Sequence, residues 1–93
     1  MMKMYDLTPN NGRKSFYGKA KVIEYDNGVI QLKSYDTIVA QVQNGKFERL
    51  WGGYSATTMR HVNAFIDMLG IDGGGKVWWD SMAKPWWDLE YNN

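Results

Sequence analysis

The sequence predicts an α+β fold: an antiparallel meander of about four strands packed by one amphipathic helix, followed by an aromatic C-terminal tail. Three observations lead to this prediction. Tight-turn dipeptides separate β-rich runs, apolar residues recur at helical spacing after residue 55, and tryptophans are concentrated after residue 76. At 93 residues we expect a single domain, residues 1–93, because a chain of this size has little room for a second core.

Residues 1–15 are assigned to an N-terminal segment, and the strand meander is expected over residues 16–51. Its strands are predicted at residues 16–25, 29–35, 38–43 and 46–51. Asn27-Gly28 and Asn44-Gly45 are dipeptides that tolerate the positive φ of tight hairpin turns, and Asp36-Thr37 is a short polar turn. Consecutive hairpins make neighbouring strands antiparallel, so we expect an antiparallel sheet.

Residues 55–70 predict a capped amphipathic helix. The hydroxyl of Ser55 can cap the N-terminus, and Gly70 can take the positive φ of a C-terminal cap. The apolar stripe between them consists of Met59, Val62, Phe65, Ile66 and Leu69. We expect this stripe to cover one face of the sheet and complete a single core.

The tail, residues 76–93, carries two tryptophan pairs separated by Pro85 and preceded by a flexible glycine break at residues 73–75. The triplet W-W-D occurs twice at a spacing of eight residues, which is too short for a repeat architecture. In one interpretation an indole of each pair closes the open end of the core; in the other, exposed indoles form a recognition surface. The candidate partner-binding residues are Trp78, Trp79, Trp86 and Trp87.

Few groups in the sequence can support catalysis. The chain has no cysteine, which excludes disulfides, thiolate nucleophiles and cysteine-containing zinc sites. His61 is the single histidine and is expected to be a polar residue on the helix flank. We therefore expect a protein that is not an enzyme and uses no metal and no cofactor. The alternative is an enzyme that uses the tail carboxylates Asp80, Asp88 and Glu90.

The net charge of +1 conceals an uneven distribution, because residues 1–24 carry +3 and residues 64–93 carry −3. The basic residues are more dilute than the clustered stripes of dedicated nucleic-acid binders, so we interpret them as a solvated strand face that pairs with the acidic tail. No apolar run approaches the ~18 to 20 residues needed to cross a bilayer. We expect a cytoplasmic protein with no membrane partner.

Three sequence motifs carry a resemblance to a known family. They are R-K-S-F-Y-G-K-A at residues 13–20, L-K-S-Y-D-T-I-V-A at residues 32–40 and Y-S-A-T-T-M-R-H-V at residues 54–62. In this order they resemble a family of small proteins of unknown function from phages and mobile elements of Firmicutes. The resemblance implies an intracellular accessory protein encoded by a phage, and it implies no activity and no site residues.

The same three motifs indicate where a shared surface could lie. Arg13 and Lys14 precede the first predicted strand, and Tyr35 lies in a polar turn. Arg60 and His61 lie at the start of the predicted helix, where free backbone N–H groups favour an anion. If the turn and the helix start come together, these five residues form an anion-accepting patch. They are the candidate contacts to an anion or to nucleic acid.

From these features we expect a small accessory protein that binds a host macromolecule and inhibits it, for example a defence nuclease such as a CRISPR effector. A host protein is the expected partner, because small surfaces with aromatic centres suit protein recognition. The alternative is a nucleic-acid or nucleotide-binding protein that uses the basic N-terminal region and exposed tryptophans. The glycine run also leaves open a homo-oligomer formed by exchange of the tail.

Overall fold

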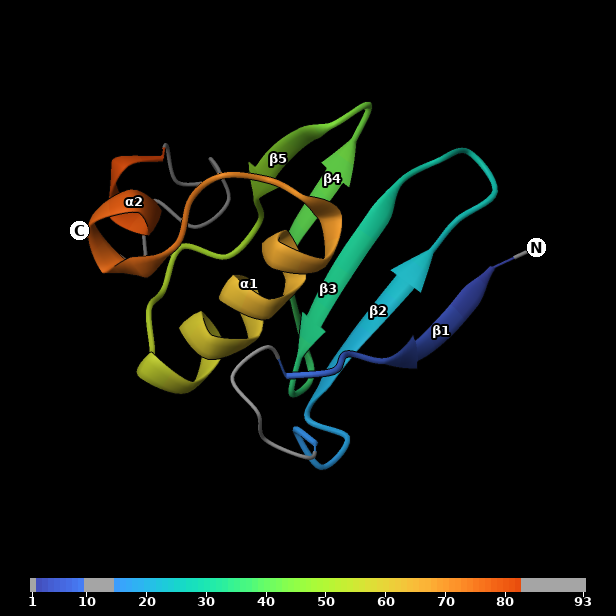
Figure 1. Ribbon diagram of the computed structural model, residues 1–93, viewed down its shortest axis with the longest axis horizontal. Coiled ribbons are helices and arrows are strands. Elements are labelled where there is room, and N and C mark those ends of the chain that lie inside the picture. The colour runs from blue at the N-terminus through green and yellow to red at the C-terminus, as the bar shows by residue number, and fades with distance from the viewer. Residues whose placement is uncertain (1, 10–14, 83–93) are drawn as a thin grey trace.

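A computed structural model of the chain describes residues 2–9 and 15–82, and it shows a five-stranded antiparallel meander followed by two helices (Figure 1). The sheet has the order β1-β2-β3-β4-β5. The elements are β1 (Lys3–Asp6), β2 (Ala20–Glu24), β3 (Ile30–Ser34), β4 (Thr37–Gln43), β5 (Lys46–Arg49), α1 (Ala56–Leu69) and α2 (Gly75–Ser81). The predicted α+β meander is confirmed, and β2 to β5 are its four predicted strands.

Strand β1 is an addition to the predicted sheet. It pairs with β2 in antiparallel register, with Met4 opposite Ile23, and all four of its residues are exposed. Its sequence gives little signal because it is short and because no tight turn joins it to β2. The N-terminal segment therefore contributes an edge strand, which the sequence did not predict.

Helix α1 covers one face of the sheet, as its apolar stripe predicts (Figure 1). Val62 and Phe65 are fully buried, and they pack against a sheet surface centred on Val22 and Leu32. Ser55 caps the helix by accepting a hydrogen bond from the backbone of Thr58 at 3.0 Å. The predicted C-terminal cap is also confirmed, since Gly70 has a left-handed backbone with φ 71°.

The opposite face of the sheet carries a row of hydrogen-bonded polar side chains. The Tyr25 hydroxyl donates to Gln31 at 3.0 Å, Gln31 donates to Gln41 at 3.1 Å, and Gln41 donates to Glu48 at 3.0 Å. The side chains of successive strand residues alternate between the two faces, so this polar row lies on the face away from the core. We call this face of the sheet, which carries Tyr25, Gln31, Gln41 and Glu48, the open face.

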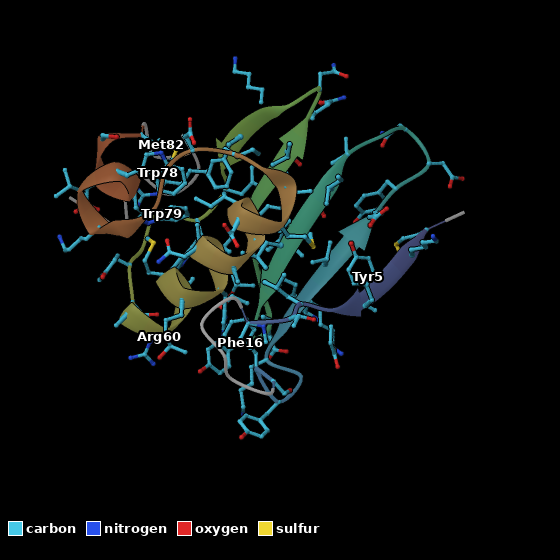
Figure 2. All side chains as sticks on the ribbon, in the orientation of Figure 1. Tyr5, Phe16, Arg60, Trp78, Trp79 and Met82 are labelled. Carbon is cyan, nitrogen blue, oxygen red and sulfur yellow. The ribbon has the colours of Figure 1, made fainter. Side chains whose placement is uncertain are left out.

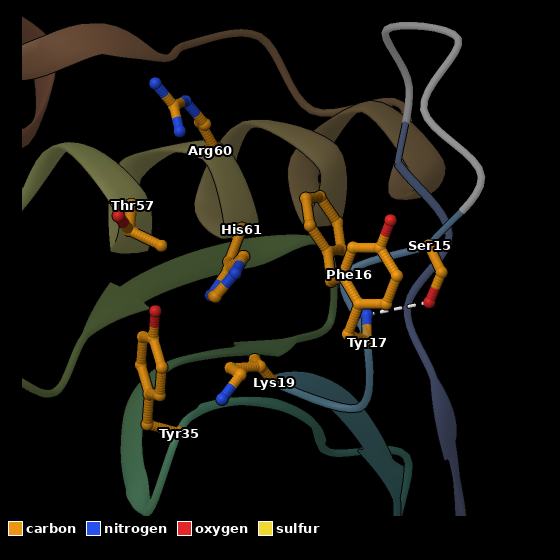
Figure 3. Close-up of a pocket in the computed structure, with 8 residues that line it drawn as sticks. All are labelled: Ser15, Phe16, Tyr17, Lys19, Tyr35, Thr57, Arg60 and His61. Carbon is orange, nitrogen blue, oxygen red and sulfur yellow. Dashed lines mark hydrogen bonds between the residues drawn. The ribbon is translucent and has the colours of Figure 1, made fainter.

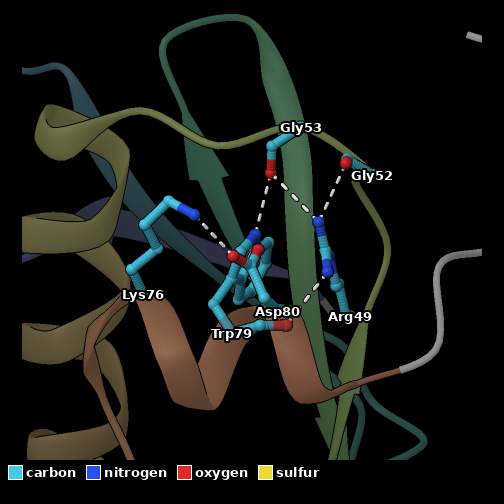
Figure 4. A network of polar contacts seen from close by, with 6 residues as sticks. All are labelled: Arg49, Gly52, Gly53, Lys76, Trp79 and Asp80. Atoms are coloured by element: carbon cyan, nitrogen blue, oxygen red, sulfur yellow. Dashed lines mark hydrogen bonds and ion pairs between the residues drawn. The ribbon is translucent and has the colours of Figure 1, made fainter. Parts of the chain in front are cut away.

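Helix α2 is a second addition, and it attaches the start of the tail to the end of β5. Arg49 is 6% exposed, and its guanidinium donates to the carbonyl oxygens of Trp79 at 2.9 Å and of Gly52 at 2.8 Å (Figure 4). The guanidinium also lies 4.5 Å from the centroid of the Trp79 ring. The Trp79 indole in turn donates to the carbonyl of Gly53 at 2.8 Å. A buried cation thus binds the helix to the β5–α1 loop through backbone oxygens.

The glycines that precede α2 are explained by backbone geometry. Gly73, Gly74 and Gly75 have φ values of 146°, 115° and 85°, in the region that side chains rarely allow. A Cβ atom on Gly73 would also lie only 2.4 Å from the Trp78 indole. The predicted glycine break at residues 73–75 therefore has a defined backbone conformation, which leads the chain into α2.

Candidate functional site

One cavity collects aromatic and basic side chains from three distant parts of the chain (Figure 3). It has a volume of about 200 Å³ and lies between the segment before β2, the β3–β4 turn and the first half of α1. Its lining residues are Ser15, Phe16, Tyr17, Lys19, Tyr35, Thr57, Arg60 and His61. We call it the tyrosine–histidine pocket.

His61 forms the inner wall of the pocket. Its ring lies between Phe16, with ring centroids 4.7 Å apart in an edge arrangement, and Tyr35, with centroids 5.8 Å apart. Nδ1 lies 2.8 Å from the Ser34 hydroxyl, which lies 3.1 Å from the Thr58 hydroxyl. The sequence placed His61 on the helix flank as a polar, hydrogen-bonding residue. In the structure it is 2% exposed, because Phe16 and Tyr35 cover both sides of the ring.

The second ring nitrogen, Nε2, faces the pocket. Every buried side-chain nitrogen or oxygen of the described residues has a hydrogen-bond partner, and within that part of the chain the His61 ring is bonded only through Nδ1. Nε2 is therefore reached by solvent, through the pocket that His61 lines. Burial, and then the positive charge of Arg60, lowers the pKa of His61, so the ring is neutral at pH 7.

The charged residues of the pocket are all basic. Lys19 and Arg60 line it, and neither forms an ion pair with a carboxylate of the described residues, where the ion pairs are Lys21–Asp6 and Lys76–Asp80. The amino group of Lys19 lies 5.6 Å from the centroid of the Tyr35 ring and beneath His61 (Figure 3). In the view of Figure 3 the Arg60 side chain lies above His61 and Lys19 lies below it, and the charge of Arg60 is one of the causes that lower the pKa of His61.

Two tyrosines at the pocket have an unusual backbone. Tyr17 and Tyr35 both have φ 55°, a left-handed conformation that costs a non-glycine residue on the order of 1–3 kcal/mol. Tyr17 and Gly18 occupy the centre of a tight turn closed by a 3.0 Å hydrogen bond from Lys19 to Phe16. Asn is an ordinary residue for the first of these positions, as at Asn44 in the β4–β5 hairpin.

Packing explains Tyr35 only in part, through its contact with the His61 ring, and it explains Tyr17 least. Tyr17 is 82% exposed and Tyr35 is 50% exposed, so neither ring contributes a fully buried surface to the fold. A backbone hydrogen bond of 2.7 Å from Tyr35 to the carbonyl of Lys19 holds the two segments together. Residues in unfavourable backbone conformations cluster at functional sites, which supports this pocket as one.

The structure brings together part of the predicted anion-accepting patch. Tyr35, Arg60 and His61 line the same pocket, while Arg13 and Lys14 lie outside the described residues. The prediction missed Ser15, Phe16, Tyr17, Lys19 and Thr57. All eight lining residues belong to the three motifs at residues 13–20, 32–40 and 54–62, which was the available signal.

The predicted tryptophan surface is divided by the structure. Trp79 is 1% exposed and forms part of the core, because its indole fills the space beside Arg49, so it offers no contact surface in this structure. Trp78 is half-buried, with its ring centroid 5.0 Å from that of Phe47 (Figure 2). Trp86 and Trp87 lie outside the described residues. One indole of the first pair thus closes the core.

The fold and the pocket define a small α+β protein whose aromatic cavity is lined by Lys19 and Arg60, which form no ion pair with the described residues. The chain belongs to the Family of unknown function (DUF8033), whose family model matches residues 4–81 and so includes the whole pocket. No curated protein and no solved structure matches the chain. No helix of the described residues is long and apolar enough to cross a membrane.

Proposed function

We propose that this protein is a non-enzymatic binding module that captures an anionic segment of another macromolecule through the tyrosine–histidine pocket. The observation that carries the proposal is the convergence of the three motifs on one cavity whose described lining has basic residues and no carboxylate. Lys19 and Arg60 can attract an anion, and the exposed rings of Tyr17 and Tyr35 can contact the group that bears it.

The hydrogen-bonded hydroxyls of Ser34 and Thr58 beside His61 fit a binding role better than a catalytic role. The Ser34 hydroxyl bonded to His61 is 2% exposed, so a substrate cannot reach it as it would reach a nucleophile. His61 binds that serine through Nδ1, and no carboxylate of the described residues orients its ring. These contacts position the ring as a rigid wall, which supports a protein that acts by binding.

The biological setting follows from the motif resemblance alone. A cytoplasmic, phage-encoded accessory protein that inhibits a host macromolecule, such as a defence nuclease, is the specific form of the proposal. The pocket is the surface that such a protein would present. Of the four predicted tryptophans, Trp79 is buried, and Trp78, Trp86 and Trp87 are a second candidate contact for the same partner.

The proposal is tested with two matched double variants. In the pocket variant, Tyr17→Asn is combined with Lys19→Gln. In the control variant, Tyr25→Asn is combined with Lys46→Gln, at the opposite end of the sheet strands. Wild type and both variants are immobilised, and their binding to polyuridylate and to polyglutamate is measured, together with capture from bacterial lysate with and without nuclease.

We expect wild type and control to bind at least one polyanion and the same lysate component, and the pocket variant to lose both. Loss of the lysate component after nuclease treatment identifies a nucleic acid, whereas its retention identifies an acidic protein. Equal binding by the pocket and control variants would contradict the proposal. Circular dichroism of each variant checks that the loss is not due to unfolding.

A further inference from the structure

The pocket combines features that together define a more specific ligand, and the following inference rests on the proposed function. We propose that the tyrosine–histidine pocket binds one nucleotide unit, with its phosphate at Lys19 and its base on an exposed tyrosine ring. The unit belongs either to a free mononucleotide or to a single-stranded nucleic acid.

Charge and hydrogen-bonding groups indicate the phosphate. The Lys19 amino group has no ion pair among the described residues, and it lies beside His61 and Tyr35 (Figure 3). The hydroxyls of Tyr35 and Thr57 are further donors in the same lining. Because none of the described lining residues is a carboxylate, none of them repels a second negative charge on the ligand.

The exposed rings indicate the base. Tyr17 presents an 82% exposed side chain at a turn position that favours Asn or Gly, so its ring is held out at a cost to the backbone. Aromatic rings hold nucleobases by stacking, and this contact tolerates any base because every base has a π-face. An acidic peptide would use Lys19 and leave the Tyr17 ring without a flat partner.

The size of the cavity limits the ligand to one unit. Pockets that enclose whole drug-sized molecules occupy roughly 300–1,000 Å³. The tyrosine–histidine pocket has about 200 Å³ and opens to the surface beside Tyr17 and Tyr35. A phosphate with part of a sugar fits inside while the base lies on the rim, and the remainder of a strand can continue into solvent.

The single histidine provides a local readout for this inference. His61 is the only histidine of the chain and lines the pocket, so its ring signals in a proton–nitrogen NMR spectrum report on this site alone. The full chain is titrated with adenosine monophosphate, uridine monophosphate, adenosine, inorganic phosphate, a short oligothymidylate and a glutamate-rich peptide. Affinities are measured in parallel by isothermal titration calorimetry.

We expect both mononucleotides to shift the His61 signals and to bind more tightly than adenosine or inorganic phosphate. Tyr17→Asn should weaken mononucleotide binding by at least about fivefold, the lower end of the range for one stacked base. Lys19→Gln should reduce mononucleotide affinity toward that of adenosine. The matched controls Tyr25→Asn and Lys46→Gln should bind as wild type does.

The remaining outcomes separate this inference from the proposed function. Tighter binding of the oligothymidylate than of the mononucleotides identifies a nucleic-acid strand as the source of the unit. The reverse identifies a free nucleotide, which supports the nucleotide inference and overturns the capture of a macromolecular segment. Pocket-dependent binding of the glutamate-rich peptide without any nucleotide binding overturns the nucleotide inference and leaves the proposed function intact. If no anionic probe binds or moves the His61 signals, both are overturned. Unchanged affinity in Tyr17→Asn and Lys19→Gln also overturns the inference.

Discussion

At the level of one residue, the binding role proposed for Tyr17 opposes its contribution to stability. Its ring is 82% exposed, while its backbone has φ 55° in a turn that suits Asn. We predict that Tyr17→Asn raises the free energy of unfolding by about 1 kcal/mol, because the strain of a left-handed tyrosine is relieved. Urea denaturation measures the change. A lower midpoint than wild type would mean that the Tyr17 ring stabilises the fold by packing.

His61 makes stability depend on pH. An unfolded histidine has a pKa of about 6.5, and in the folded chain burial and the charge of Arg60 lower that pKa, so the unfolded state binds more protons. The stability of the fold with neutral His61 is therefore fully present above the pKa of histidine in the unfolded chain. It is lost as the pH falls toward the lower pKa of His61 in the folded chain. The free energy of unfolding should therefore decrease below about pH 6.5, by at most about 1.4 kcal/mol per pH unit from this residue.

The variant His61→Asn isolates this contribution. Asn keeps a polar atom near the position of Nδ1 and does not titrate, so carboxylates contribute equally to both proteins. The difference in unfolding free energy between wild type and variant should shrink as the pH falls from 8 to about 5. A difference that stays constant over this range would show that the pKa of His61 is the same in the folded and unfolded chains.

Part of the pocket could be predicted from the sequence. The other pocket residues were missed because nothing in the sequence indicated one local turn. Tyr35, Arg60 and His61 were identified because a polar turn and a helix start have clear signals. Tyr17 and Lys19 were missed because residues 16–25 were predicted as one strand, whereas β2 begins at Ala20. Tyrosine is not a usual residue at the first centre of a tight turn, so the Tyr17-Gly18 turn had no sequence signature.

Helix α1 was predictable as an element because each of its determinants is local in sequence. Ser55, the apolar stripe and Gly70 mark its start, its buried face and its end, and all three agree with the structure. Helix α2 lacked such signals. It has seven residues, its N-cap residue Gly74 makes no side-chain cap bond, and its attachment depends on Arg49, which lies 30 residues from Trp79. Such long-range contacts cannot be read from periodicity.

The attachment of α2 gives a prediction at the level of the element. Trp79 is 1% exposed and interacts with Arg49 and Gly53, whereas Trp78 is half-buried against Phe47. Trp79→Ala should lower the free energy of unfolding by about 3–5 kcal/mol, the usual cost of removing a buried aromatic side chain. Trp78→Ala is the matched control and should cost clearly less. Equal losses in urea denaturation would contradict the assignment of Trp79 as the indole that closes the core.

At the scale of the whole molecule, a net charge of +1 gives little general attraction for polyanions. Binding must therefore depend on local charge, and the pocket supplies it through Lys19 and Arg60. Among the other cations of the described sheet, Lys21 is neutralised locally, since it pairs with Asp6 at 2.6 Å. The molecule is thus expected to recognise a small number of phosphates at one place.

This placement predicts a shallow but measurable salt dependence for single-stranded nucleic acid. Each neutralised phosphate of a single strand contributes a slope of about −0.7 to the plot of log affinity against log salt concentration. With Lys19 and Arg60 as the two contacts, we expect a wild-type slope between about −0.7 and −1.4. Lys19→Gln should reduce the slope by about 0.7, and Lys46→Gln should leave it unchanged.

A wild-type slope near zero would exclude phosphate contacts, and a steep slope that only Lys46→Gln reduces would place binding on the open face. Unfolding free energies over the same salt range should change little, because the ion pairs Lys21–Asp6 and Lys76–Asp80 are exposed to solvent and already contribute little to stability.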